Sequence, residues 1–294
     1  MAETTADAMA HEFDIEEVEY LRHNGEALIA RLFKPRGRGP FPAVIDAHGG
    51  AWCGGHRTNN DPINAAMARA GVVVASLDFR VPPQACYPGS VADLNYGIRW
   101  LKAHAADLGS APQMVGAMGT SSGGHLVVLA AGKPEDPRYR AIPMMGNEAL
   151  DARVAFLIVT WPVISPLGRY QYLKEAEGIA RLGRARAQSM IANHDRYWLS
   201  EAAMAEGDPG LALERGDPME LPPLLYVQNP DDPLHPRANL ERFVAAYRKA
   251  GGEVEIQWFE GDNYDLLRSD ADAPAAQRAL RAMSDFAHRH ARRQ

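Results

Sequence analysis

The stretch Gly119-Thr120-Ser121-Ser122-Gly123-Gly124 decides how this sequence folds. It follows an apolar run at residues 114–118 and leads into a helix-like segment that begins at His125-Leu126. A serine with glycines two residues before and two residues after it, between a strand and a helix, is typical of the sharp turn called the nucleophile elbow. The glycines let backbone approach where a Cβ atom would clash. We therefore expect the hydroxyl of Ser121 at the exposed end of a strand, as a candidate nucleophile.

Short apolar or β-branched runs alternate with longer helix-like segments along the chain. The expected strands are residues 17–21, 27–33, 43–46, 72–78, 114–118, 154–160, 224–228 and 254–259. The expected helices are residues 64–70, 91–106, 122–131, 237–250 and 275–291. Two opening strands followed by β-α units predict an α/β fold, with a mostly parallel eight-stranded sheet and helices on both faces. Such sheets place their sites at the carboxyl ends of strands, where Ser121 lies.

One segment, residues 165–223, interrupts this alternation because it contains amphipathic helical pieces and no clear strand. It separates the expected strand at residues 154–160 from the one at residues 224–228. We expect a single domain over residues 1–294, with this segment inserted as a helical cap over the strand ends. Its aromatic side chains either line a pocket or give the insertion a small core of its own. Residues 193–198 are the part most expected to face the site.

Composition and charge exclude several classes of function. A chain of 294 residues with 46% hydrophobic content can bury one large core. A formal charge of -6 argues against a nucleic-acid or anionic-membrane surface. The first seven residues are acidic and lack the layout of a signal peptide. Cys53 and Cys86 have no metal-ligand spacing, which indicates free thiols. We therefore expect a cytoplasmic protein that binds neither nucleic acid nor membrane and takes a small-molecule substrate.

A second motif, His48-Gly49-Gly50-Ala51-Trp52, follows the expected strand at residues 43–46. Glycines at a strand end permit backbone N–H groups to point into a cleft. Such N–H groups stabilise a developing oxyanion. A further donor would be the N–H of Ser122, directly after the candidate nucleophile. Together with the elbow, this motif indicates a site built for attack on a carbonyl group.

A third motif lies at residues 228–236, after the expected strand at residues 224–228, and contains two adjacent aspartates. A carboxylate at this strand end is where the acid of a Ser-His-Asp triad would orient the general base. We favour Asp232 for this role. Asp231 is assigned to a solvated turn, which the neighbouring prolines favour.

These motifs resemble the α/β-hydrolase fold, and within it the hormone-sensitive-lipase-like bacterial esterases, over nearly the whole chain. The resemblance rests on His48-Gly49-Gly50-Ala51-Trp52, Asp78-Phe79-Arg80, Tyr87-Pro88 with Asp93, Gly119-Thr120-Ser121-Ser122-Gly123-Gly124-His125, Asp232-Pro233-Leu234 and Ala250-Gly251-Gly252. It implies oxyanion donors at the N–H groups of Gly50, Ala51 and Ser122, with Ala51 where members of the family usually have a third glycine.

The same resemblance implies hydrolysis of small esters through an acyl-enzyme at Ser121, without a metal or an organic cofactor. It also implies that the chain can form a homodimer. The other residues expected to bind substrate are Gly49, Trp52, Trp161, His194 and Tyr197.

The resemblance breaks at residues 259–266, the loop that carries the catalytic histidine in the family. The matching position here is Tyr264. A phenol with a pKa of about 10 is a poor acceptor for the serine proton at neutral pH, compared with an imidazole at about 6.5. We therefore expect Tyr264 at the base position, through natural divergence or an introduced substitution, and altered or weakened catalysis. Tyr264→His is then expected to raise ester hydrolysis by at least roughly 10².

Three histidines are alternatives for a displaced base: His56 near the glycine motif, His194 in the insertion and His235 three residues after Asp232. For each of them a solvated or structural role is the default. Two other classes of function stay open beside the esterase. One is a lyase, dehydratase or cyclase in which Tyr264 acts as an acid, and the other is a non-catalytic protein that keeps the pocket to bind a ligand.

Overall fold

The computed structural model describes residues 10–261 and 263–291, and its centre is an eight-stranded sheet in the order β1-β2-β4-β3-β5-β6-β7-β8. The strands are β1 (Phe13–His23), β2 (Glu26–Pro35), β3 (Ala43–Ala47), β4 (Val73–Leu77), β5 (Val115–Thr120), β6 (Leu157–Thr160), β7 (Leu224–Gln228) and β8 (Val254–Trp258). β2 runs antiparallel to both β1 and β4, and all other neighbours are parallel. The predicted α/β fold with a mostly parallel eight-stranded sheet is confirmed.

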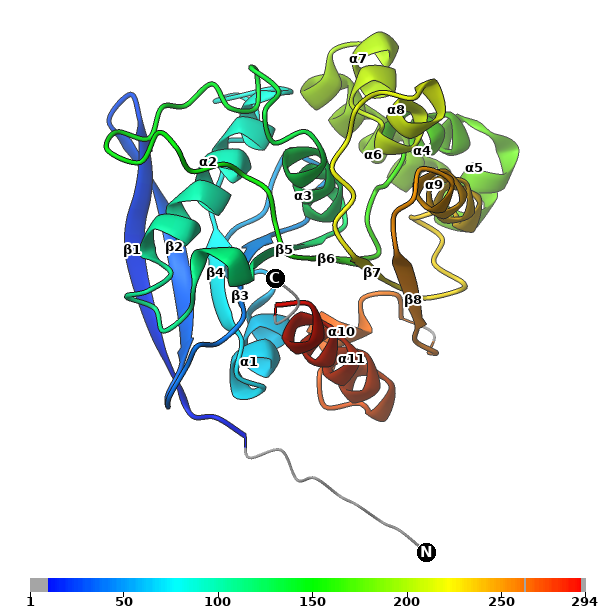
Figure 1. Cartoon of the computed structure of the whole chain (residues 1–294). Coiled ribbons are helices and arrows are strands. Elements are labelled where there is room, and N and C mark those ends of the chain that lie inside the picture. Colours follow the sequence, from blue (N-terminus) through cyan, green and yellow to red (C-terminus); the bar gives the residue numbers. More distant parts are fainter. Residues whose placement is uncertain (1–9, 262, 292–294) are drawn as a thin grey trace, which may run out of the picture.

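Helices cover both faces of the sheet (Figure 1). The face shown below the sheet carries α1 (Asp61–Arg69), α10 (Leu266–Ser269) and α11 (Pro274–Ala291). The face shown above it carries α2 (Gly89–His104) and α3 (Ser122–Gly132), and α9 (Arg237–Lys249) lies near β8. A short 3-10 helix, η1 (Pro112–Met114), leads into β5.

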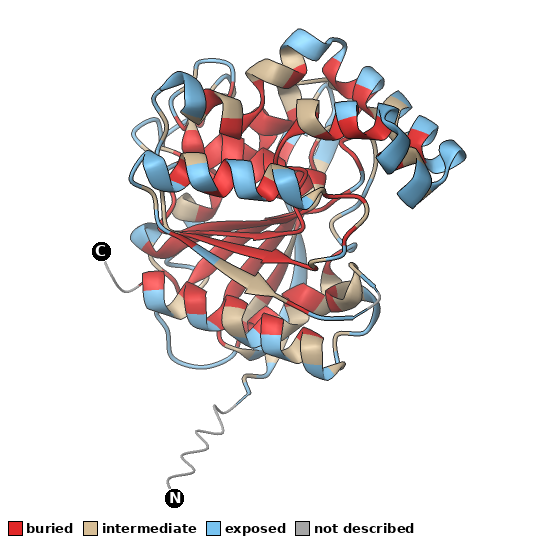
Figure 2. Ribbon diagram, turned by 90° about the vertical axis from the view of Figure 1, so that its right-hand side faces the viewer, coloured by how far each residue is buried: buried red, intermediate tan, exposed pale blue. Residues whose placement is uncertain are grey.

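The core consists of the central strands and the inner sides of these helices. Every residue of β3, β4, β5, β6 and β7 is buried. Figure 2 shows this buried sheet between helices whose outer sides are exposed. Because both faces are covered, such strands form nearly continuous apolar runs in the sequence instead of alternating with polar residues. That property explains why the strands around the candidate nucleophile could be predicted.

Five helices lie between β6 and β7, in the segment where the sequence predicts an insertion. They are α4 (Pro166–Lys174), α5 (Ala176–Leu182), α6 (Arg184–Trp198), α7 (Glu201–Glu206) and α8 (Pro209–Arg215), and Figure 1 shows them together at the upper right. We call these five helices the cap. Tyr172 belongs to a small core within the cap, whereas Tyr197 and Trp198 belong to the main core. Tyr172 therefore contributes to a small core of the insertion, as one of the two expectations had it, whereas Tyr197 and Trp198 join the cap to the main core.

The largest difference from the expected boundaries is in β1, which runs over Phe13–His23 instead of residues 17–21. Its outer positions are mostly exposed and polar, so the sequence carries little apolar signal there. The strand continues because it pairs with β2 through a tight turn in which Asn24 and Gly25 both have positive φ, 48° and 90°. Two residues with positive φ are typical of the two-residue turns that match the twist of a hairpin.

Within the described ranges, no helix combines the length and apolar character that a bilayer crossing requires. The acidic first seven residues, on which the expected lack of a signal peptide rests, lie outside those ranges. Both cysteines are free and partly buried.

Candidate active site

Ser121 lies at the turn between β5 and α3, in a backbone conformation (φ 53°, ψ −120°) that side-chain-bearing residues rarely adopt. Two hydrogen bonds hold the turn: the Ser121 N–H donates to the Thr160 carbonyl at 3.0 Å, and the Ser121 carbonyl accepts from the Val163 N–H at 3.0 Å. A Cβ atom at Gly123 would overlap the carbonyl oxygens that end β3. The turn therefore needs glycine at that position, and it presents the Ser121 side chain at the strand end.

The Ser121 hydroxyl is hydrogen-bonded to a histidine. Its Oγ lies 3.1 Å from Nε2 of His235, and Nδ1 of the same ring lies 2.7 Å from Oδ2 of Asp232. Because the carboxylate accepts a hydrogen bond from Nδ1–H, the neutral ring has Nε2 free to accept a proton from the serine. His235 and Asp232 are both buried. The three side chains form a continuous Ser-His-Asp chain of hydrogen bonds.

Asp232 and His235 come from the same loop, between β7 and α9. Oδ1 of Asp232 accepts hydrogen bonds from the backbone N–H groups of Leu234, at 2.7 Å, and His235, at 3.2 Å. An aspartate that bonds to backbone two and three residues later closes a tight local turn. Gln228 donates from Nε2 to the His235 carbonyl at 3.1 Å and ties the end of the loop back to β7. This turn directs the His235 ring towards the end of β5.

Tyr264 makes a different contact from the one the sequence suggests. Its hydroxyl accepts a hydrogen bond from Nη2 of Arg186 at 3.2 Å. Its ring stands edge-on to the His235 ring, with 6.0 Å between centroids. The partner of the Ser121 hydroxyl is thus His235, one of the three alternatives, and Tyr264 packs edge-on against that imidazole. The difference arises because the loop after β7, rather than the loop after β8, brings an imidazole to Ser121.

The other two alternative histidines bond elsewhere. His56 is exposed, and its ring contacts the hydroxyl of Thr58 at 3.0 Å and the guanidinium of Arg57 at 2.8 Å. His194 is fully buried in α6, with Nδ1 2.8 Å from the Met190 carbonyl. Burial is the main reason that the pKa of His194 falls to about 3. Neither ring is hydrogen-bonded to Ser121.

The glycine motif passes directly beside the nucleophile. A Cβ atom at Gly49 would lie 3.1 Å from the Cβ of Ser121. Gly50, Ala51 and Trp52 all have positive φ, of 128°, 50° and 61°. The Cys53 N–H donates to the Gly50 carbonyl at 3.0 Å and closes these residues into a tight turn.

The N–H groups expected to stabilise an oxyanion are available for it. Among residues 10–261 and 263–291, no backbone carbonyl accepts from the N–H of Gly50 or Ala51. Ser122 is the first residue of α3, where N–H groups have no acceptor within the helix. The geometry therefore offers a carbonyl oxygen near Ser121 three candidate N–H donors.

His48 braces this loop from inside. Its ring stacks on Phe79 with centroids 4.2 Å apart, and Nδ1 lies 2.8 Å from the Gly49 carbonyl. Burial lowers the pKa of His48 to about 4, so the ring is neutral at pH 7 and donates from Nδ1.

Trp52 joins the same loop to the cap. Its Nε1 donates to Nδ1 of His125 at 3.3 Å, and its ring stacks on Tyr197 with centroids 5.7 Å apart and an interplanar angle of 9°. His194 packs edge-on against it at 5.0 Å. Trp161, which the sequence also suggests as a substrate-binding residue, is fully buried against Phe259 in the core. Trp52, His194 and Tyr197 thus form one buried cluster, and Trp161 is not part of it.

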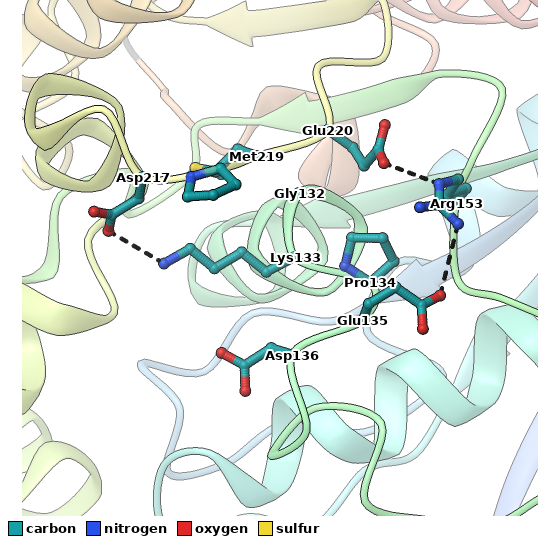
Figure 3. A pocket seen from close by; sticks show the side chains of 10 residues that line it. Gly132, Lys133, Pro134, Glu135, Asp136, Arg153, Asp217, Met219 and Glu220 are labelled. Atoms are coloured by element: carbon teal, nitrogen blue, oxygen red, sulfur yellow. Dashed lines mark hydrogen bonds and ion pairs between the residues drawn. The ribbon is translucent and has the colours of Figure 1, made fainter.

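A hollow in the described part of the chain lies away from these residues. It measures about 550 Å³ and is lined by residues around the C-terminal end of α3 and the segment before β7. Ion pairs cross it: Lys133 with Asp217, and Arg153 with Glu135 and Glu220 (Figure 3). Because Ser121 is at the opposite end of α3, this hollow is separate from the Ser-His-Asp chain.

Comparisons with known proteins agree with the fold. A family model described as BD-FAE matches residues 32–157. The chain resembles carboxyl esterase 2 of the fungus Tuber melanosporum, with a TM-score of 0.73 and 21% identity over 95% of this chain and 88% of that one. It resembles a bacterial heroin esterase with a TM-score of 0.72 and 23% identity over 95% of this chain and 85% of that one. The chain has the α/β-hydrolase fold.

Curated relatives cover most of this chain but extend well beyond it. The chain is 25% identical over 271 residues to LipM of Mycobacterium tuberculosis, named a probable carboxylic ester hydrolase, across 91% of this chain and 59% of the relative. It is 27% identical over 248 residues to the esterase LipC of the same organism, across 81% and 56%. The chain therefore spans just over half the length of these two relatives.

Proposed function

We propose that this α/β-hydrolase is a serine hydrolase of the carboxylesterase type that acts on small esters. The observation that carries the proposal is the hydrogen-bonded chain from Ser121 through His235 to Asp232. The names of the similar proteins, which are ester hydrolases, support the same class of reaction.

Each member of the chain has one role in the proposed reaction. Ser121 attacks the ester carbonyl while Nε2 of His235 takes its proton, and Asp232 holds the ring and stabilises the imidazolium. The N–H groups of Gly50 and Ser122, with that of Ala51, stabilise the oxyanion. His235 then protonates the leaving alkoxide, which leaves an acyl-enzyme on Ser121.

The second half of the reaction uses the same groups. Water loses a proton to His235 as its oxygen attacks the acyl-enzyme, and the proton returns to Ser121 as the carboxylic acid is released. Tyr264 has no proton-transfer step in this scheme. The alternative lyase and non-catalytic functions depend on Tyr264 at the base position, and the contact of His235 with Ser121 favours the hydrolase over both.

An active-site-directed fluorophosphonate tests the nucleophile. We expect it to modify the intact protein once, at Ser121, as located by peptide mass spectrometry. Ser121→Ala should abolish both this modification and the hydrolysis of p-nitrophenyl acetate. Turnover that survives in Ser121→Ala, or modification at another residue only, would contradict the proposal. Ser122→Ala is a matched control for the label, because it removes the adjacent hydroxyl but keeps the backbone N–H.

A further inference from the structure

An arginine that the sequence does not single out lies inside the site. Arg169 is on α4 of the cap and is only 2% exposed. Its Nε donates to Nε2 of His194 at 3.4 Å, and its Cζ lies 5.1 Å from the centroid of the Trp52 ring. Over the described residues, Arg169 has no carboxylate partner within ion-pair distance, and its buried Nη2 has no hydrogen-bond partner.

A buried guanidinium without an anion is unusual. Burying a charge is expensive unless it is paired and hydrogen-bonded. Burial lowers the pKa of Arg169 to about 9, so the group is still mostly protonated at neutral pH. The charge of Asp232 offsets part of this lowering of the Arg169 pKa, but within the described residues the two groups form no ion pair. The oxygens of Asp232 bond instead to the backbone N–H groups of Leu234 and His235 and to the His235 ring.

His194 and Trp52 fix the direction of this guanidinium. The neutral His194 ring donates from Nδ1 to the Met190 carbonyl at 2.8 Å, so its Nε2 must accept, and it accepts from the Nε edge of Arg169. The Trp52 ring covers one face of the guanidinium. The unpartnered Nη2 edge is left for another acceptor.

Arg169 and His235 line the same narrow crevice. The other lining residues are Pro162, Val163, Ile164, Ser165, Tyr226, Pro236 and Asn239. The backbone of Val163 is hydrogen-bonded to the carbonyl of Ser121, so this crevice is directly beside the nucleophile. As it stands, the crevice has no room for a water molecule. A ligand therefore enters only if the crevice widens.

From this geometry we infer that Arg169 determines substrate specificity by binding a carboxylate of the substrate. The preferred substrates are then esters that carry a free carboxylate a few bonds from the scissile carbonyl, such as half-esters of short dicarboxylic acids. A carboxylate matches the planar donor edge of a guanidinium better than any neutral group does. The inference rests on the proposed ester hydrolysis and deepens it.

Pairs of substrates that differ by one charge test the inference. The monomethyl and dimethyl esters of succinic and glutaric acid share the acyl chain and the leaving group. For at least one pair, we expect the wild-type kcat/KM for the monomethyl ester to exceed that for the dimethyl ester by at least about tenfold. A preference for the dimethyl ester in both pairs would overturn the inference.

Variants then assign that preference to Arg169. Arg169→Met should lower the ratio of the two kcat/KM values by at least about tenfold, and Arg169→Lys should keep part of the preference, because it keeps the charge but loses the planar edge. The control, Arg184→Met, removes an exposed positive charge from α6 and should leave the ratio unchanged. An unchanged ratio in Arg169→Met would overturn the inference.

A binding experiment separates this inference from the proposed function. Glutarate should raise the Tm of Ser121→Ala, and it should not raise the Tm of the double variant that also contains Arg169→Met. If wild type hydrolyses neither type of ester, the proposed function is contradicted, and the glutarate result still decides the role of Arg169. If neutral esters are hydrolysed but glutarate has no effect on either variant, only the inference fails.

Discussion

His235 meets the requirements of a general base through its contacts rather than through its place in the sequence. Its Nδ1 faces Asp232 and its Nε2 faces Ser121, so the tautomer that accepts the serine proton is the one that the carboxylate stabilises. Asp232 is itself oriented by two backbone N–H groups. An acid and a base on one short loop move together, and their mutual geometry does not depend on how β7 and β8 are placed.

The contacts of Tyr264 predict that its hydroxyl matters little for turnover. Tyr264→Phe removes a hydrogen bond with Arg186 but keeps the ring edge-on to His235. We expect kcat/KM for p-nitrophenyl acetate to stay within about tenfold of wild type, because an exposed hydrogen bond contributes only about 1 kcal/mol. A loss of 10² or more would show that the phenol takes part in catalysis.

Tyr264→His distinguishes the sequence prediction, in which residue 264 occupies the base position, from the assignment of His235 as the base. If residue 264 stood at an empty base position, the histidine would raise hydrolysis by at least roughly 10². Because His235 already contacts Ser121, we expect no such increase. Steady-state kinetics on the same ester decides between the two outcomes.

At the scale of elements, the site depends on three segments meeting with little free space. The elbow packs against the end of β3, the glycine motif passes beside Ser121, and Trp52 joins that motif to α6 of the cap. A change in one of these segments should therefore affect both stability and the reactivity of Ser121.

Gly123→Ala tests the contact between α3 and β3. Its Cβ atom would overlap two backbone carbonyls, which cannot move aside as a side chain can. We expect a loss of about 2–3 kcal/mol in the free energy of unfolding, measured in urea, together with slower fluorophosphonate labelling. The matched control is Gly132→Ala, at the other end of the same helix, where the new Cβ would crowd only the end of the flexible Met219 side chain and lie in ordinary contact, at 3.7 Å, with the Glu220 carbonyl oxygen. The control should lie between neutral and about 1 kcal/mol more stable. Equal losses in both variants would contradict the elbow geometry.

Tyr197→Ala tests the contact between the cap and the glycine motif. Removing the ring that stacks on Trp52 leaves a cavity in a buried cluster, which should lower the free energy of unfolding by about 3–5 kcal/mol. It should also slow the labelling of Ser121, because the loop beside the nucleophile loses its support. Tyr197→Phe, which keeps the ring, is the control. Labelling at the wild-type rate in a folded Tyr197→Ala protein would contradict this link.

For the whole molecule, stability should fall at mildly acidic pH. Burial lowers the pKa of His48 and His125 to about 4 and that of His194 to about 3. These rings are neutral in the folded state but protonate near pH 6.5 once unfolded. The contribution of these rings to the free energy of unfolding is therefore fully present above pH 6.5. It is lost as the pH falls towards 4, because the unfolded chain binds protons that the folded protein does not. We expect each ring to account for a decrease of about 2 kcal/mol in the free energy of unfolding between pH 7.5 and pH 5.

Urea unfolding at these two pH values measures the effect. His125→Gln should show a smaller decrease than wild type, because it removes one of the three imidazoles whose pKa burial lowers. A free energy of unfolding that is the same at pH 7.5 and pH 5 in the wild-type protein would contradict the prediction.

The overall fold could be predicted because it depends on local patterns. β7 has the same bounds in sequence and structure, and the elbow is marked by glycines whose Cβ atoms would collide with backbone. The identity of the catalytic base, in contrast, does not follow from a local pattern alone. The sequence narrows it to Tyr264 and three histidines, but which loop reaches Ser121 depends on a turn closed by the Asp232 side chain. The spacing of Asp232 and His235, three residues apart on one loop, is the local signal that favours the pair.

Arg169 could not be predicted at all. Nothing in the residues around it distinguishes a buried arginine without a partner from an exposed one. Its importance appears only when α4, the Trp52 loop and His235 are placed together.

The most direct test of the account is the kcat/KM of His235→Ala for p-nitrophenyl acetate, measured beside Tyr264→Phe and wild type. Loss of the triad base should lower turnover by roughly 10⁴–10⁶, while Tyr264→Phe stays within about tenfold of wild type. A His235→Ala enzyme that keeps most of its activity, with Tyr264→Phe inactive, would contradict the assignment of His235 as the base.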